Sequence, residues 1–168
     1  MKQELERQLR CLSELISSVS PEEYSKPLES LHGSTIGQHM RHCIEFVQCV
    51  FAGTKSGVVC YDERKRDKRI EELPVIALEA IGELILLNQE HSDCPLMLRQ
   101  QYPHGTIEAN TTLVREIIFN IEHIVHHQAI IKTAIRSLGI DKLAKDFGVA
   151  ASTLAYNQHV HVQSATNS

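Results

Sequence analysis

Two histidines in the second half of the chain have the spacing of metal ligands carried by one helix. His123 and His127 are four residues apart, within a stretch over residues 116–132 that is otherwise rich in aliphatic residues. At helical period their imidazoles lie one turn apart on the same face. Such a pair can offer two nitrogens to one metal ion, although paired histidines in a core or on a surface have the same spacing. A metal site therefore requires a third ligand from elsewhere in the chain.

Glu116 and Asn120 continue the same helical stripe, seven and three residues before His123. Aliphatic residues flank the stripe, so we expect it to be buried, and buried imidazoles need hydrogen-bond partners. A metal-bound imidazole usually donates its second ring N–H to a carboxylate or a carbonyl, and either residue suits this role. Glu116 is also a candidate catalytic base.

A second pair of histidines, His39 and His42, lies in the first half of the chain. They are three residues apart, so helical phase alone lets either one supply the third nitrogen. Three histidines would leave a coordination position open, which is typical of catalytic zinc sites and not of structural ones. Glu45 lies about one turn beyond His42 and is a second candidate for the catalytic base or for a partner of a ligand imidazole.

Four amphipathic segments are predicted to position these residues. Apolar residues recur at i, i+3 or i+4, and i+7, which predicts long helices near residues 2–19, 35–52, 74–89 and 113–138. Thr35 and Gln38 have capping-box spacing, Thr111 or Thr112 caps the last long helix, and Gly139 follows its end. Short connectors predict an all-α fold, an antiparallel four-helix bundle in which facing helices build the site.

Three smaller features complete the expected fold. Residues 96–98 and 106–108 flank the sequence Tyr-Pro-His-Gly, which predicts a small hairpin before the last long helix. Gly53 and Gly57 are expected to close the second long helix. A short final helix is predicted over residues 141–147.

Composition limits the class of protein. The 168 residues suit one domain, predicted over residues 1–158, followed by a polar tail over residues 159–168. A formal net charge of −4 argues against general nucleic-acid binding. No apolar run approaches the roughly 20 residues of a membrane span, and the first residues are too polar for a secretory signal. We therefore expect a cytoplasmic protein without a membrane partner.

The cysteines are predicted to be reduced, buried packing residues. Their number is odd and no two are in a C-x-x-C arrangement, so neither a disulfide framework nor a thiolate zinc site is indicated: Cys11, Cys43, Cys49, Cys60 and Cys94.

A mixed-charge segment over residues 61–69 has five basic and three acidic residues. Such a segment usually forms a solvated loop. The alternative is that one of its side chains leans over the mouth of a pocket and orients a substrate. The candidates for this role are Tyr61, Asp62, Arg66 and Asp67.

Two motifs resemble those of the DinB/YfiT-like superfamily. Residues 35–45, T-I-G-Q-H-M-R-H-C-I-E, have a histidine seven residues after the capping threonine, and residues 122–130, E-H-I-V-H-H-Q-A-I, have the H-x-x-x-H motif. A T-x-x-R-E sequence before the second motif and the later F-G-V-A-A-S-T extend the resemblance over almost the whole chain. The resemblance implies a four-helix bundle, often dimeric, that holds a divalent metal ion through three histidines.

Carried over position by position, the resemblance implies that His42, His123 and His127 are the ligands. His39 then becomes a residue of the pocket wall or a partner of a ligand. His126, about 100° around the helix from His127, is expected to point away and to pack between helices or at a dimer face. Imidazole ligands suit zinc and nickel equally.

The resemblance leaves three functions open. A metal-dependent hydrolase would activate a water molecule against a small substrate. A thiol S-transferase would bind a low-molecular-weight thiol at the metal, and the basic region at Arg64 and Arg66 would hold its carboxylates. A non-catalytic chain would use the metal to stabilise a module that binds a small molecule or a partner. A homodimer is expected in each case.

Overall fold

Four long helices make up about half of the computed structural model, which describes residues 1–140, 143–144 and 146–157. The long helices are α1 (Lys2–Ser18), α3 (Ile36–Ser56), α5 (Pro74–Glu90) and α6 (Leu113–Ser137). The shorter helices are α2 (Pro21–Ser25), η1 (Glu29–Leu31), η2 (Tyr61–Glu63) and α4 (Lys68–Glu72). The predicted bounds of the long helices agree with these to within four residues.

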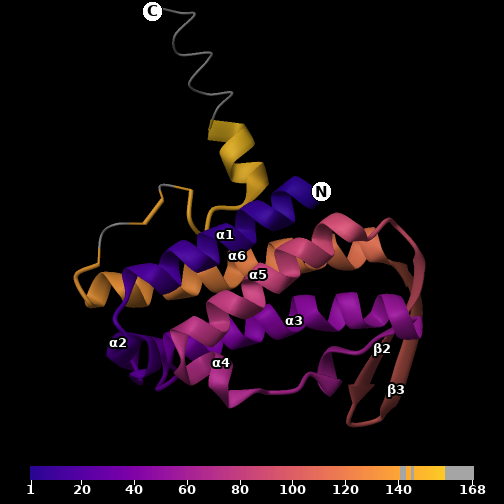
Figure 1. Cartoon of the computed structure of the whole chain (residues 1–168), viewed down its shortest axis with the longest axis horizontal. Helices are drawn as coiled ribbons and strands as arrows, with labels where there is room; N and C mark the ends of the chain where they lie inside the picture. The colour runs from indigo at the N-terminus through magenta and orange to yellow at the C-terminus, as the bar shows by residue number, and fades with distance from the viewer. Residues whose placement is uncertain (141–142, 145, 158–168) are drawn as a thin grey trace, which may run out of the picture.

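Each long helix packs against two others. Helix α3 packs against α5 and α6, and α1 packs against the same two helices (Figure 1). The core between them is aliphatic: Leu5, Leu9, Leu12 and Leu15 of α1 are fully buried, as is Ile44 of α3. Burial of each such side chain stabilises the fold by about 1.5–3 kcal/mol. A mainly helical fold is thus confirmed, whereas the antiparallel four-helix topology stays a prediction.

The ends of α3 follow from its sequence. Gln38 N donates to Thr35 Oγ1 at 3.0 Å and Thr35 N donates to Gln38 Oε1 at 3.2 Å, so the predicted capping box is present. The prediction that Gly53 helps to close the helix is wrong, because α3 continues to Ser56 and ends at Gly57 with a φ of 79°. Gly53 has a packing role instead: a Cβ atom there would lie 2.6 Å from Val59 Cγ2.

Helix α6 begins and ends as its sequence indicates. Thr112 is the capping residue, since its Oγ1 accepts from Arg115 N at 3.2 Å. Gly139, with a φ of 74°, follows the last helical turn. A left-handed conformation of this kind favours glycine.

A small sheet modifies the predicted all-α fold. Strands β2 (Pro95–Tyr102) and β3 (Gly105–Thr112) pair antiparallel with Tyr102 opposite Gly105, which confirms the predicted hairpin. A third strand, β1 (Val58–Val59), pairs parallel with β2 and gives the order β1-β2-β3. A strand of two residues is too short to show alternation, so the sequence pattern could not indicate it.

The region after α6 differs from the prediction of a short helix over 141–147. Residues 141, 142 and 145 lie outside the described part, and residues 143–144 and 146–147 are not helical. A helix over 151–157 is present instead. Residues 146–147 are held against the helices, since Asp146 pairs with Arg7 at 2.6 Å and Phe147 is buried. The predicted tail over 159–168 lies outside the described residues.

Two further predictions concern cysteines and membranes. All five cysteines are free, three of them buried and two half-buried. Among the helices of the described residues, none combines the length and the apolar character that a membrane crossing requires.

Candidate metal centre

Helices α3 and α6 bring three imidazoles together. His42 on α3 and His123 and His127 on α6 each offer one nitrogen, and these three atoms lie within 4.8 Å of one another. The closest pair is His42 Nε2 and His123 Nε2, 2.8 Å apart. The helical spacing of four residues places the two α6 imidazoles on one face. Contact of that face with α3 adds the third imidazole.

His39 lies directly against one member of this group. Its Nδ1 is 2.9 Å from His127 Nδ1, so one of the two nitrogens carries the shared proton. This contact leaves His127 Nε2 as the nitrogen that can face an ion. If His127 Nδ1 donates to His39 Nδ1, the lone pair of His127 Nε2 is free for coordination, which is the usual role of an outer hydrogen-bond partner.

Burial keeps the clustered imidazoles neutral. It lowers the pKa of His42 to about 4, with further contributions from His123 and Arg64, and it lowers the pKa of His127 to about 3. The pKa values of His39 and His123 are also lowered, again chiefly by burial. Neutral imidazole is the form that binds metals, so near pH 7 no proton has to be removed before an ion binds.

An aromatic wall that the sequence analysis did not identify covers one side of the histidines. The Phe46 ring stacks on His123, with centroids 4.8 Å apart, and its centroid is 4.2 Å from that of His42. Phe119 stacks on the His123 ring at 5.6 Å. Phe46 follows His42 by four residues and Phe119 precedes His123 by four, so helical spacing could have identified both.

Glu116 belongs to a separate buried network. Its carboxylate accepts from Tyr61 Oη at 2.5 Å, from Thr111 Oγ1 at 2.7 Å and from Arg115 Nη1 at 2.9 Å. Asn120 Nδ2 donates to Tyr61 Oη at 2.9 Å. Seven residues separate Glu116 from His123, about 10 Å along the helix axis. The carboxylate is thus engaged by three donors, and its role as a catalytic base stays a prediction.

Glu45 is buried but only partly satisfied. Its Oε1 accepts from Asp67 N at 2.6 Å. Its Oε2 is buried without a hydrogen bond, while Arg41 Nε and Arg64 Nε each lie 3.9 Å away. Glu45 therefore joins α3 to the loop before α4, and its role as a catalytic base also stays a prediction.

Among the four candidates of the charged segment, Tyr61 is the one whose ring contacts the aromatic wall of the histidine cluster, at Phe46. The Tyr61 ring stacks on Phe46 with centroids 4.7 Å apart, and burial and Glu116 raise its pKa. Arg64 also contacts this aromatic wall: its guanidinium carbon lies over the Phe46 ring, 5.6 Å from the ring centroid.

The other three candidates of the segment order the loop itself. Asp62 Oδ2 accepts from Gln101 N at 2.9 Å, and Arg66 Nη1 donates to the Asp62 carbonyl at 3.1 Å. Asp67 caps α4 and pairs with Arg69 at 2.6 Å. Within the described chain none of these three side chains has a hydrogen bond or an ion pair to the clustered histidines, and their role at a pocket mouth stays a prediction.

The histidine geometry and the two motifs agree with a comparison against known protein families. The profile of the DinB family matches residues 1–158. The chain belongs to the DinB family. No curated protein and no solved structure matches it. Membership of the DinB family and a three-histidine group are together compatible with metal binding.

The remaining histidines in the described part of this DinB-family chain lie outside the group. His126 is exposed, with its centroid 5.5 Å from that of His127, so the prediction that it packs between helices of the chain is wrong, and a dimer-face role stays a prediction. His32 and His104 are exposed. His91 is half-buried, with Nδ1 2.8 Å from the Leu87 carbonyl oxygen.

Proposed function

We propose that His42, His123 and His127 hold one divalent metal ion, zinc or nickel, on an antiparallel four-helix scaffold. The observation that carries this proposal is that the three nitrogens lie within 4.8 Å of one another. Their lowered pKa values support it, because all three imidazoles are neutral near pH 7. Three protein ligands leave a position for a water molecule or a substrate.

The proposed activity is hydrolysis of a small substrate by an activated water molecule. A bound divalent ion supplies Lewis acidity and lowers the pKa of a coordinated water toward about 7. The chain's own residues prepare the site: His39 orients His127, and the rings of Phe46 and Phe119 stack on His123. Glu116 and Glu45 are the candidate bases.

A thiol S-transferase is the second candidate, and the positions of the two carboxylates favour it. Glu116 is engaged by three donors and Glu45 by Asp67 N, whereas a thiol ionised by a metal needs no protein base. Arg64, above Phe46, offers a positive charge to an anionic cosubstrate. The thiol would come from outside the chain, since Cys43 is fully buried and burial raises its pKa.

Metal content followed by activity assays tests these proposals. The purified chain should contain about one zinc or nickel ion, and His127→Ala should contain almost none. A hydrolase should cleave ester or amide probes without an added thiol, and an S-transferase should consume an electrophile only when a low-molecular-weight thiol is present. Metal binding with neither activity would favour the non-catalytic binding module, and absence of metal would contradict all three.

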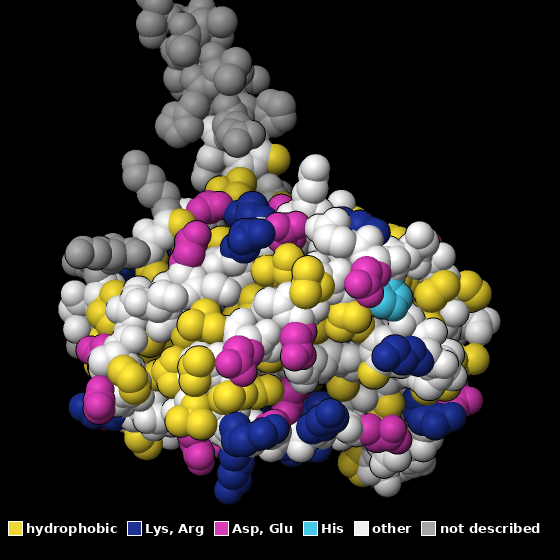
Figure 2. All heavy atoms as spheres, viewed as in Figure 1, with side chains coloured by type: hydrophobic (Ala, Val, Ile, Leu, Met, Phe, Trp, Pro, Cys, Tyr) yellow, Lys and Arg dark blue, Asp and Glu magenta, His cyan; other side chains and the backbone are white. Residues whose placement is uncertain are grey.

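We also propose a homodimer that buries the outer face of α5. Leu86 and Val75 are 66% and 56% exposed and lie eleven residues apart, on the same side of the helix. Figure 2 shows apolar side chains gathered over α4 and α5. Sedimentation should give about twice the 19.0 kDa chain mass at micromolar protein, and Leu86→Glu should shift the species toward the monomer. A monomer for the unaltered chain would contradict the proposal.

A further inference from the structure

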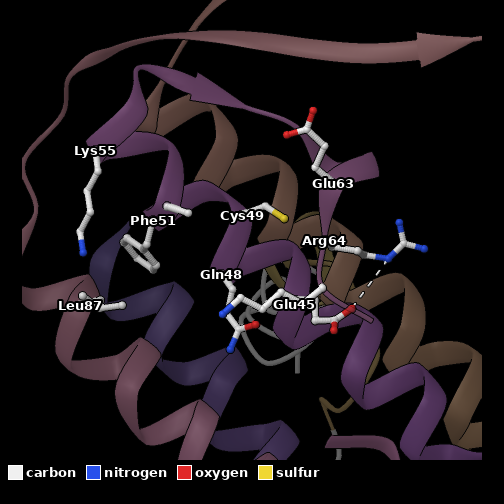
Figure 3. Close-up of a pocket in the computed structure, with 10 residues that line it drawn as sticks. Glu45, Gln48, Cys49, Phe51, Lys55, Glu63, Arg64 and Leu87 are labelled. Atoms are coloured by element: carbon white, nitrogen blue, oxygen red, sulfur yellow. Dashed lines mark ion pairs between the residues drawn. The ribbon is translucent and has the colours of Figure 1, made fainter. Parts of the chain in front are cut away.

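A cavity of about 320 Å³ lies beside the histidine cluster without including any of its histidines. It is open to solvent and is bounded by α3, by η2 with the loop that follows it, and by α5 (Figure 3). Its size is that of a small-molecule site. Residues that define it include Glu45, Cys49, Phe51, Ala52, Lys65 and Leu87.

The cavity has an apolar end and a polar end. Phe51 and Leu87 lie at one end, and Glu45 and Arg64 lie at the other (Figure 3). Ala52 and Cys49 line the wall as well, and burial raises the pKa of Cys49 to about 11, so its thiol remains protonated near pH 7. A ligand that fills this cavity therefore needs an apolar body and a polar head.

The polar end contains an acceptor that lacks a donor. Glu45 is 1% exposed, and its Oε2 is buried without a hydrogen bond. Two guanidinium groups, those of Arg41 and Arg64, balance the charges of Glu45 and of Glu71, which pairs with Arg41 Nη1 at 2.7 Å. The Nε atoms of both arginines are 3.9 Å from Glu45 Oε2, too far for hydrogen bonds. Because the charge is already balanced, the missing partner is a neutral N–H or O–H group and not a cation.

The lining of the cavity also includes an unpaired positive charge. Lys65 follows Arg64 in the chain and lines the cavity. Among the described residues its ammonium group has neither a hydrogen bond nor an ion pair, and Lys55, at the apolar end, is also without one. A carboxylate on the ligand would pair with Lys65 while a neighbouring donor reached Glu45 Oε2.

We propose that this cavity binds a small apolar carboxylic acid that carries a neutral hydrogen-bond donor beside its carboxylate, such as an N-acyl amino acid or a 2-hydroxy acid. The carboxylate pairs with Lys65, the donor reaches Glu45 Oε2, and the apolar body lies along Ala52 toward Phe51 and Leu87. Arg64 connects this site to the candidate metal centre, because it borders the cavity and also lies over Phe46. The inference does not depend on metal binding.

Calorimetric titration of the full chain with three related probes tests the chemistry. N-acetyl-L-phenylalanine has all three features, 3-phenylpropionate lacks the donor, and N-acetyl-L-phenylalaninamide lacks the charge. We expect each incomplete probe to bind about tenfold more weakly than the complete one. Equal affinities for the three probes, or no binding of the complete probe, would overturn the proposal.

Variants locate the binding on the molecule. Ala52→Trp should fill the cavity and abolish binding, whereas Ile107→Trp, on the exposed face of the hairpin, should leave it unchanged. Lys65→Gln should weaken the complete probe about tenfold and the uncharged amide little. Undiminished binding by Ala52→Trp or Lys65→Gln would place the site elsewhere and overturn the proposal.

The metal proposal and the cavity proposal can fail separately. His127→Ala removes a proposed metal ligand that does not line the cavity, so it should still bind N-acetyl-L-phenylalanine. If removal of the metal abolished binding while Ala52→Trp did not, the probe would occupy the metal centre, and the cavity proposal would be wrong.

Discussion

Helix α6 carries two polar clusters, one buried and one half-buried, that differ in how they are satisfied. At its first turns Glu116 accepts from hydroxyl and guanidinium donors, and Tyr61 links it to Asn120. Two turns later His123 and His127 contact other imidazoles, those of His42 and His39. The first cluster combines a carboxylate with donors, whereas the second consists of one kind of group.

We interpret this difference as one between a cluster that stabilises the fold and the proposed metal site. A buried carboxylate with matched donors stabilises the fold without a ligand. Neutral imidazoles can share protons in pairs, but a cluster of lone pairs is best satisfied by a cation. We therefore expect changes at the glutamate cluster to alter stability, and changes at the histidine cluster to alter metal binding.

The largest expected effect is on metal binding by His127→Ala. Removal of one of three ligands should weaken metal affinity by more than about a hundredfold, beyond the 10–100-fold typical of outer partners. Plasma mass spectrometry of the purified protein and competition with a chelator measure this loss. His126→Ala, at the exposed neighbouring position, is the matched control and should retain the metal. Full metal content in His127→Ala would remove the distinction between the clusters.

Glu116→Gln tests the opposite cluster. Loss of the charge weakens three hydrogen bonds, so the free energy of unfolding should fall by about 2 kcal/mol while the metal content stays unchanged. Urea denaturation measures the first and metal analysis the second. Glu108→Gln is the control, because Glu108 pairs with Arg99 on the surface and such pairs contribute about 0–1 kcal/mol. Loss of metal from Glu116→Gln would show that the clusters are coupled.

His39→Ala should have a smaller effect on the metal. The variant removes the hydrogen-bond partner of His127 Nδ1 but no proposed ligand, so affinity should fall about tenfold with the stoichiometry unchanged. Chelator competition measures the affinity, and His104→Ala, on the exposed turn of the hairpin, is the control. A loss as large as that of His127→Ala would make His39 a ligand.

The stability of the metal-free chain should depend on pH through the neutral imidazoles of the histidine cluster. The pKa of His42 is lowered to about 4 and that of His127 to about 3, so the unfolded chain binds more protons than the folded chain below about pH 6.5. The contribution of these two neutral imidazoles to the free energy of unfolding is therefore fully present above that pH and is lost progressively as the pH falls toward 3. The midpoint urea concentrations of unfolding at pH 7.5, 6 and 5 in a chelating buffer measure this loss of stability. Unchanged midpoints would contradict the claim that the folded chain keeps these histidines neutral.

Local chemistry made much of this fold predictable. The helix period placed His123 and His127 on one face, and the capping box at Thr35 and the turn before β3 are encoded within a few residues. The β1 strand could not be predicted in the same way, because Val58–Val59 is defined by its pairing with residues 97–98, far along the chain.

Only the packing of α3 against α6 decided how the histidines pair. Helical phase allows either His39 or His42 to face α6, since three residues correspond to most of one turn. The observed contact places His42 beside His123 and His39 beside His127. The sequence thus determined which imidazoles could meet, and the relative position of two helices, set by the whole core, determined which ones do.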